Sequence, residues 1–128
     1  MPSATSVSMK DAAVGFLELA SAGEVQEAFD RYVAPSFRHH NVHFQSDARS
    51  LAAGMSQNAA AYPQKVYEAK HVVQEGHFVA VHGRVRLQPD ERDYALFHLF
   101  RFEDGRVVEL WDVAQAAPAD SPNELGLF

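Results

Sequence analysis

The sequence predicts an α+β domain in which three helices pack on one face of a strongly curved antiparallel β-sheet. Apolar residues recur at helical spacing in three segments within the first half of the chain. Four segments that read as strands fill most of the second half. The pairs Glu75-Gly76 and Asp104-Gly105 are tight-turn signals between consecutive strands, as in a meander. Helices that precede such a meander must bury their apolar faces on one side of the sheet.

The helices are marked by their ends as well as by their period. Ser8 followed by Asp11 resembles a capping box at the start of the first helix. Gly23 breaks the first apolar pattern, while Pro35 and Pro63 end the second and third. We therefore expect helices over residues 9–20, 25–33 and 47–62.

Four strands are expected after the third helix. The loop between the second and third strands contains Pro89. We find no repeat or linker, so residues 1–128 are expected to form one domain. The tail 118–128, rich in Pro and Ala, receives no assigned element. The expected strands are 65–74, 78–87, 93–102 and 106–116.

Composition limits the possible partners and compartment. The formal charge of −6 argues against a nucleic-acid backbone or an anionic membrane as the main partner. The chain has no cysteine, which excludes disulfides, thiolate nucleophiles and cysteine zinc sites. No apolar run approaches the ~20 residues that span a bilayer. Asp11 and Glu18 interrupt the apolar part of the N-terminus, so we expect no signal peptide and a cytoplasmic protein.

His98 and Asp112 are the most informative residues for function. Each lies inside an apolar strand, where a histidine or carboxylate is costly to bury without a partner or a purpose. In one curved sheet the two side chains could line the same cavity and transfer protons there. The plainer alternative for His98 is a core histidine bonded to a backbone carbonyl.

The register of the last hairpin decides whether this pair meets. Strict alternation groups Asp112 with Val108, opposite Val107 and Trp111. A loop of only two residues would place His98 opposite Trp111, on the face away from Asp112. A three-residue loop or a β-bulge would bring His98 opposite Asp112. The sequence leaves both registers open.

Both faces of the expected sheet are largely apolar. One face covers the helices, and the other needs a second cover. A second copy of the chain is the simplest cover, which predicts a homodimer through the outer face of the sheet.

The segment 36–45 is rich in His and Asn and has no helical period, so we expect a short extended stretch or a loop. His39, His40 and His43 suggest a metal site at first sight. Their spacing, however, matches no standard zinc pattern. We therefore predict no metal.

Together these features resemble the SnoaL-like proteins of the NTF2-like superfamily over nearly the whole chain. The two amphipathic helices, the HHN element at 39–41, the third helix and the meander carry the resemblance. VVQEGHFVAVHGRV is similar to the family's second and third strands. GRVVELWDVAQAAP is similar to its last strand with the Trp-Asp pair. This fold hosts many activities.

The resemblance implies an NTF2-like cone, in which helices close the open end of a bent sheet around a mostly apolar pocket. In SnoaL-like polyketide cyclases, a strand histidine and a last-strand aspartate act in an intramolecular aldol condensation. His98 and Asp112 match those positions by strand and spacing. Ketosteroid isomerases share the fold, but their oxyanion-hole pattern is not visible in this chain, and neither is the Arg/Asp set of limonene-epoxide hydrolases.

The expected activity is acid/base chemistry, an aldol cyclisation or an isomerisation, on a small hydrophobic carbonyl compound. Desolvation in the pocket would make Asp112 a stronger base, and His98 would orient the substrate, protonate its oxygen or tune Asp112. No metal or organic cofactor is required. Expected rim groups are His40, Asn41 and His82, and expected apolar walls are Tyr62, Phe97, Phe100 and Trp111.

The alternative is a non-catalytic module that binds a small apolar ligand or assembles as a dimer. In that case His98 and Asp112 only shape the pocket.

Overall fold

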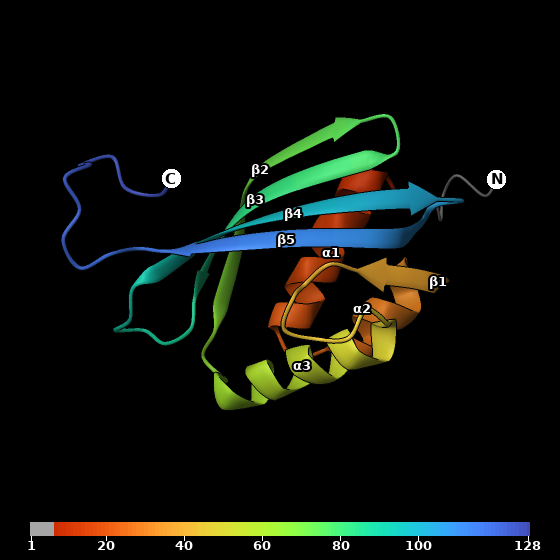
Figure 1. The fold of residues 1–128 in the computed structure, drawn as a ribbon, viewed down its shortest axis with the longest axis horizontal. Helices are drawn as coiled ribbons and strands as arrows, with labels where there is room; N and C mark the ends of the chain where they lie inside the picture. The colour runs from red at the N-terminus through yellow and green to blue at the C-terminus, as the bar shows by residue number, and fades with distance from the viewer. Residues whose placement is uncertain (1–6) are drawn as a thin grey trace.

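Three helices lie on one side of a five-stranded sheet (Figure 1). The computed structural model describes residues 7–128. The strand order is β1-β5-β4-β3-β2, and only β1 and β5 run parallel. The expected α+β class is confirmed, with one strand more than the sequence predicts. The elements are α1 (Met9–Ser21), α2 (Val25–Tyr32), β1 (Val33–His39), α3 (Ala48–Ala61), β2 (Val66–Glu75), β3 (Phe78–Arg86), β4 (Asp93–Glu103) and β5 (Arg106–Ala116).

Side-chain caps fix where the helices begin. The Ser8 hydroxyl accepts a hydrogen bond from the Asp11 amide at 3.0 Å, which starts α1. Asp47 caps α3 by accepting from the Ser50 amide at 2.9 Å. Gly23 takes a positive φ of 91° between α1 and α2 and allows the tight connection there.

The additional strand β1 corrects the sequence-based boundaries around Pro35. The second helix ends at Tyr32 rather than reaching Val33, whose φ of −106° and ψ of 138° are extended. A β-branched valine two residues before a proline favours this switch, because Pro35 has no N–H for a helix. At the sheet edge the missing donor is tolerated. The register of β1 against β5 shifts between Val33 and Arg38.

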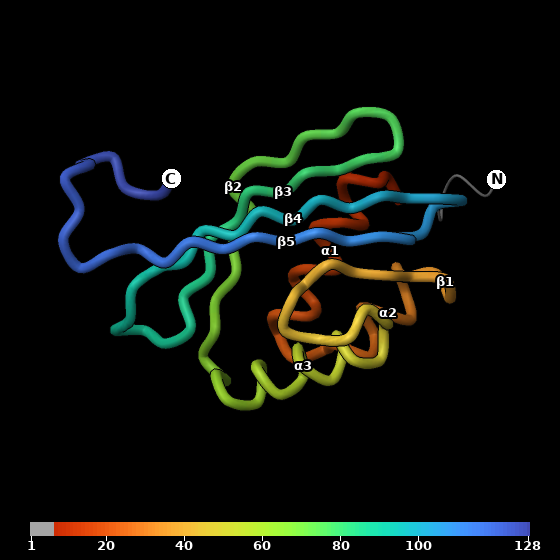
Figure 2. The backbone as a smooth tube through the Cα atoms, viewed as in Figure 1, coloured from red at the N-terminus to blue at the C-terminus, as the bar shows by residue number. Residues whose placement is uncertain are grey.

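A bulge bends the sheet at β2. The pairing of β2 with β3 shifts register between Ala69 and His71, so Lys70 is an extra residue in β2. Such bulges increase twist and bend a strand. Figure 2 shows β2 rising from the end of α3 and then turning sharply toward the β2–β3 hairpin. This curvature creates a concave inner face that the helices cover.

A second bulge sets the register of the last hairpin. Asp104 and Gly105 form a two-residue turn with φ values of 50° and 78°. Phe102 pairs with Val107, but Arg101 pairs with Glu109, so Val108 is inserted between them. The insertion shifts every later pair by one and brings His98 opposite Asp112. It also corrects the strict alternation expected for β5, because Val107 is 1% exposed and belongs to the core.

Phe16 on α1 joins the helices to the sheet. Its ring contacts Phe29 of α2 and Phe100 of β4 edge to face, with centroids 5.2 Å and 5.9 Å away. All three rings are buried. Among the helices within residues 7–128, none is long and apolar enough to cross a bilayer.

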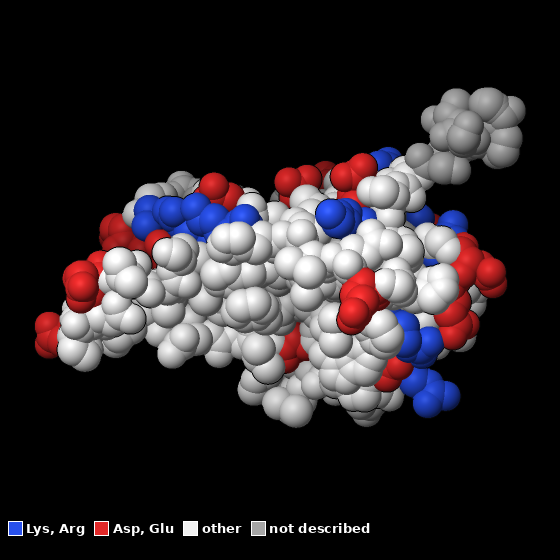
Figure 3. All heavy atoms as spheres, turned by 90° about the horizontal axis from the view of Figure 1, so that it is seen from above, with Lys and Arg blue, Asp and Glu red and all other residues white. Residues whose placement is uncertain are grey.

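The outer face of the sheet carries apolar side chains without a cover from the described chain. Phe97 is 50% exposed and Val113 68% exposed, and Phe78 and Trp111 lie on the same face. Seen from above the view of Figure 1, the middle of the surface holds few charged residues (Figure 3). We call Phe78, Phe97, Trp111 and Val113 the outer apolar patch.

Candidate functional site

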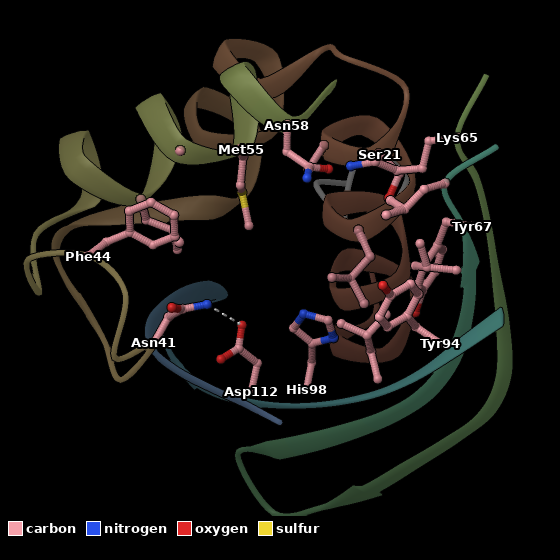
Figure 4. A pocket seen from close by; sticks show the side chains of 17 residues that line it. Ser21, Asn41, Phe44, Met55, Asn58, Lys65, Tyr67, Tyr94, His98 and Asp112 are labelled. Carbon is pink, nitrogen blue, oxygen red and sulfur yellow. Dashed lines mark hydrogen bonds between the residues drawn. The ribbon is translucent and has the colours of Figure 1, made fainter. Parts of the chain in front are cut away.

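A cavity of about 300 Å³ lies between the inner face of the sheet and the helices. Its floor includes His98 and Asp112, and α3 supplies Met55 and Asn58 on the opposite side (Figure 4). Apolar side chains of α1, α3, β3 and β4 line most of the space between them. Concave, mostly apolar sites with a few polar groups are typical of small-molecule binding.

Asp112 receives a hydrogen bond from Asn41, whose Nδ2 donates to the Asp112 Oδ2 at 3.1 Å. The loop after β1 holds Asn41 in place. The His40 amide donates to the Leu110 carbonyl at 2.9 Å, and the Asn41 Oδ1 accepts from the His43 amide at 3.0 Å. Because Oδ1 is engaged in the loop, the NH₂ group is directed to the carboxylate. Asn41 therefore orients Asp112 in the cavity.

His98 lies directly opposite Asp112 and is only 6% exposed. Burial lowers the pKa of the imidazolium to about 4, while the negative charge of Asp112 acts in the opposite direction. His98 is therefore neutral near pH 7. Its buried Nδ1 has no hydrogen-bond partner among the described residues. A buried polar atom without a hydrogen-bond partner lowers the stability of the fold, and in native structures a functional role is one reason for such an atom.

Three expected site residues lie on the wrong face of the sheet. Trp111 and Phe97 point to the outer side, because they are the sequence neighbours of the inward-facing Asp112 and His98. His82 pairs with Phe97 and therefore lies on the same outer face. The His82 ring stacks on Phe97 at 4.5 Å. The expectation that they contact a ligand in the cavity is therefore wrong in position.

Three further expected residues also lie outside the cavity. His40 stacks on Trp111 at 4.9 Å, and its Nε2 is 2.7 Å from the Glu109 carboxylate. Phe100 faces inward but is fully buried in the core. Tyr62 ends α3 and lines a separate surface groove. Of the expected rim and wall residues, only Asn41 lines the cavity.

The histidines of the HHN element do not converge. His39 is buried, with Nε2 at 2.5 Å from the Gln45 carbonyl and Nδ1 accepting from the Asn41 amide. His40 points to the outer side. Within residues 7–128, no group of three His, Asp or Glu side chains could hold a metal ion.

Lys65 and Tyr67 line the cavity, although we did not select them from the sequence. Lys65 immediately precedes β2, and Tyr67 is the second residue of that strand. The spacing of two residues between them is the sequence signal that both side chains face the same side. Gly83 makes room for Tyr67, because a Cβ at that position would collide with the tyrosine hydroxyl. Gly54 does the same for Phe44, whose ring packs against α3 beside the cavity.

Several solved structures have the same fold. IdmH of Streptomyces antibioticus, a proposed polyketide cyclase, aligns with a TM-score of 0.70 and 19% identity over 85% of this chain and 93% of its own. A SnoaL-like polyketide cyclase of Agrobacterium tumefaciens gives 0.68 and 13%, covering 85% of this chain and 92% of that one. An NTF2-like protein of unknown function from Cytophaga hutchinsonii gives 0.68 and 14%, covering 85% and 91%.

No curated protein sequence matches the chain. The identities to the solved structures are low, so these likenesses establish the fold alone. The family comparison extends further, because the model of the SnoaL-like domain matches residues 13–110. This match covers the helices from Ala13 onward, the Asn41 loop and the sheet as far as Leu110, and the chain therefore belongs to the SnoaL-like domain family.

Proposed function

We propose that the chain is a small-molecule enzyme that performs acid/base chemistry on a hydrophobic carbonyl compound, as an aldol cyclisation or an isomerisation. One observation carries this proposal. A carboxylate oriented by Asn41 stands beside a neutral, buried His98 on the floor of a mostly apolar cavity. The likeness to polyketide cyclases of the same fold supports the reaction class.

Asp112 is the base in this mechanism. Its carboxylate removes a proton from the carbon beside a carbonyl, and the C–H electron pair becomes the enolate. A neutral His98 can donate its N–H to the developing oxyanion without giving up a full proton. In an aldol step the enolate carbon attacks a second carbonyl, and the new alkoxide takes the proton back. In an isomerisation the proton returns to another carbon.

Exchange of carbon-bound hydrogen tests this proposal without the natural substrate. In D₂O, the protein should speed deuterium uptake at the α-carbon of 1-indanone, a bicyclic ketone, as followed by NMR. Asp112→Asn should lower the exchange rate by about a hundredfold or more. Asp104→Asn in the exposed turn is the matched control and should leave the rate unchanged. Equal rates in wild type and Asp112→Asn would show that Asp112 is not the base.

A second proposal concerns self-association. The outer apolar patch supports a homodimer, because such patches on a soluble chain mark interaction sites. Val113→Asp would place an uncompensated charge in this interface and should shift sedimentation from dimer to monomer. Ala53→Asp, at an exposed position of α3, should leave the dimer intact. A wild-type monomer in sedimentation would remove this proposal and would leave the enzymatic one standing.

A further inference from the structure

We propose that the helical end of the cavity binds a negatively charged oxygen of the ligand, a carboxylate or phenolate, through Lys65. This inference rests on the proposed function for the reacting end and names the substrate class. The ligand is an apolar compound with an enolisable carbonyl near Asp112 and an acidic group at its other end. Figure 4 places Lys65, Ser21 and Asn58 at one end of the cavity, and Asp112 and His98 at the other.

Lys65 differs from the cations within β2, β3 and β4. Arg84 and Arg86 pair with Asp93, Lys70 pairs with Glu68, and Arg101 pairs with Glu109. The Lys65 ammonium enters no ion pair with a described carboxylate. Burial alone lowers its pKa.

A half-buried ammonium without a counter-charge is costly, and an anion in the cavity would offset that cost. A backbone hydrogen bond fixes the position of Lys65 just before β2, since its amide donates to the Tyr62 carbonyl at 3.0 Å. Because no carboxylate within residues 7–128 pairs with Lys65, its ammonium does not stabilise the fold through an ion pair. Its place in the cavity wall suits a ligand-binding role instead.

The neighbours of Lys65 suit an oxygen anion. Ser21 can donate its hydroxyl and Asn58 its amide group. Tyr67 forms the adjacent wall. Burial raises the pKa of its phenol, so this side chain stays uncharged. Its hydroxyl has no hydrogen-bond partner among the described residues. Three neutral donors and one cation thus gather at one end of the cavity.

Opposite charges at the two ends would orient the ligand. Asp112 repels an acidic group and Lys65 attracts it, so a ligand with one acidic end binds in one direction. Glu18, an exposed residue of α1, carries a negative charge that acts on Tyr67 at this end of the cavity. Removing that charge should strengthen anion binding.

Calorimetry with a matched pair of probes tests the inference. 2-Naphthoate and 2-naphthamide have nearly the same shape and differ in charge. We expect wild type to bind the naphthoate at least about tenfold more tightly, which is the lower end of the effect of one charged hydrogen bond. Lys65→Met should reduce this preference to about one, and Lys65→Gln should do the same. Lys65→Arg should retain it, and Glu18→Gln should increase it.

Lys70→Met is the matched control, because Lys70 lies within β2, which Lys65 immediately precedes, and forms an ion pair with Glu68. It should leave the preference unchanged, and circular dichroism should show the same fold in all variants. A preference that persists in both Lys65→Met and Lys65→Gln overturns the inference. So does a wild type that binds the naphthoate no better than the naphthamide. The calorimetry does not depend on deuterium exchange. If the exchange experiment showed that Asp112 is not the base, the binding data would still test the role of Lys65.

Discussion

Asn41 and Asp112 are 71 residues apart in sequence and are joined by a hydrogen bond of 3.1 Å at the cavity floor. The contact links the loop after the edge strand β1 to the far half of β5. The hydrogen bond engages the Oδ2 atom of Asp112, while the Oδ1 atom of Asp112 accepts no hydrogen bond from a described residue. One oxygen is thus held and the other is left for a substrate, which is the geometry a positioned base requires.

Asn41→Ala should weaken catalysis without abolishing it. The Asp112 carboxylate would remain but would lose its orienting donor, which predicts a roughly tenfold lower rate of indanone exchange. His43→Ala in the same exposed loop is the control, because its side chain takes no part in the Asp112 contact. NMR exchange rates measure the effect. A rate in Asn41→Ala equal to that of wild type would show that the hydrogen bond has no positioning role.

His98 should make the protein less stable in acid. Its pKa is lowered from 6.5 to about 4 in the fold, so between these values the unfolded chain binds the extra proton. The contribution of the neutral imidazole is fully present above pH 6.5 and is lost as the pH falls toward 4. At pH 5 the loss is about 2 kcal/mol.

Urea unfolding of wild type and His98→Phe at pH 7.5 and pH 5 measures this loss. The variant should lose less stability on acidification, since position 98 no longer titrates. His43→Phe, in an exposed loop, serves as the control and should keep the wild-type dependence. Parallel loss of stability in wild type and His98→Phe would contradict a buried neutral His98.

Sequence patterns predicted the elements well wherever a local signal fixed them. Caps, prolines and turn pairs located three helices and four strands, because these signals act within a few residues. The segment 36–45 is expected as a short extended stretch or a loop, and β1 (Val33–His39) is not expected as a strand of the sheet, because its strand character depends on pairing with the distant β5. The sequence also could not decide whether the last hairpin contains the bulge at Val108, since the turn Asp104-Gly105 is compatible with both registers.

The site was predictable only in part for the same reason. Once the bulge places His98 opposite Asp112, period-two alternation sends Trp111 and Phe97 to the outer face. Their aromatic character suggested pocket walls, but aromatic residues suit an uncovered outer face equally well. Lys65 carries no local mark of function, because only the folded chain brings the residue before β2 to the cavity.

Gly83→Ala should destabilise the fold by about 1–3 kcal/mol, because the new methyl group collides with the Tyr67 side chain. Adding Tyr67→Leu should recover most of that loss, since the shorter side chain leaves the space free. Urea titrations of the two single variants and the double variant give the coupling directly. Additive effects would mean that the two residues do not share this space.

Tyr67→Phe isolates the tyrosine hydroxyl from its ring. The hydroxyl is buried without a partner among residues 7–128, so its removal should leave stability unchanged or slightly higher. The unfolding free energy in urea measures this. A loss above about 1 kcal/mol would reveal a hydrogen bond that the hydroxyl makes in solution.

Gly54→Ala should separate stability from ligand binding. Alanine favours the interior of α3 by about 1 kcal/mol over glycine. The new methyl group meets the far end of the Phe44 ring, which is 39% exposed and belongs to a loop. That ring can move at little cost, so we expect stability equal to wild type or higher. Because Phe44 lines the cavity, its displacement should weaken 2-naphthamide binding several-fold.

Phe44→Leu combined with Gly54→Ala is the control for this separation, since the smaller side chain leaves room for the methyl group. The double variant should bind 2-naphthamide as Phe44→Leu alone does, whereas the single Gly54→Ala should bind it less tightly than wild type. Calorimetry and urea unfolding measure the two quantities on the same samples. Unchanged affinity in Gly54→Ala would show that Phe44 does not form part of the binding surface.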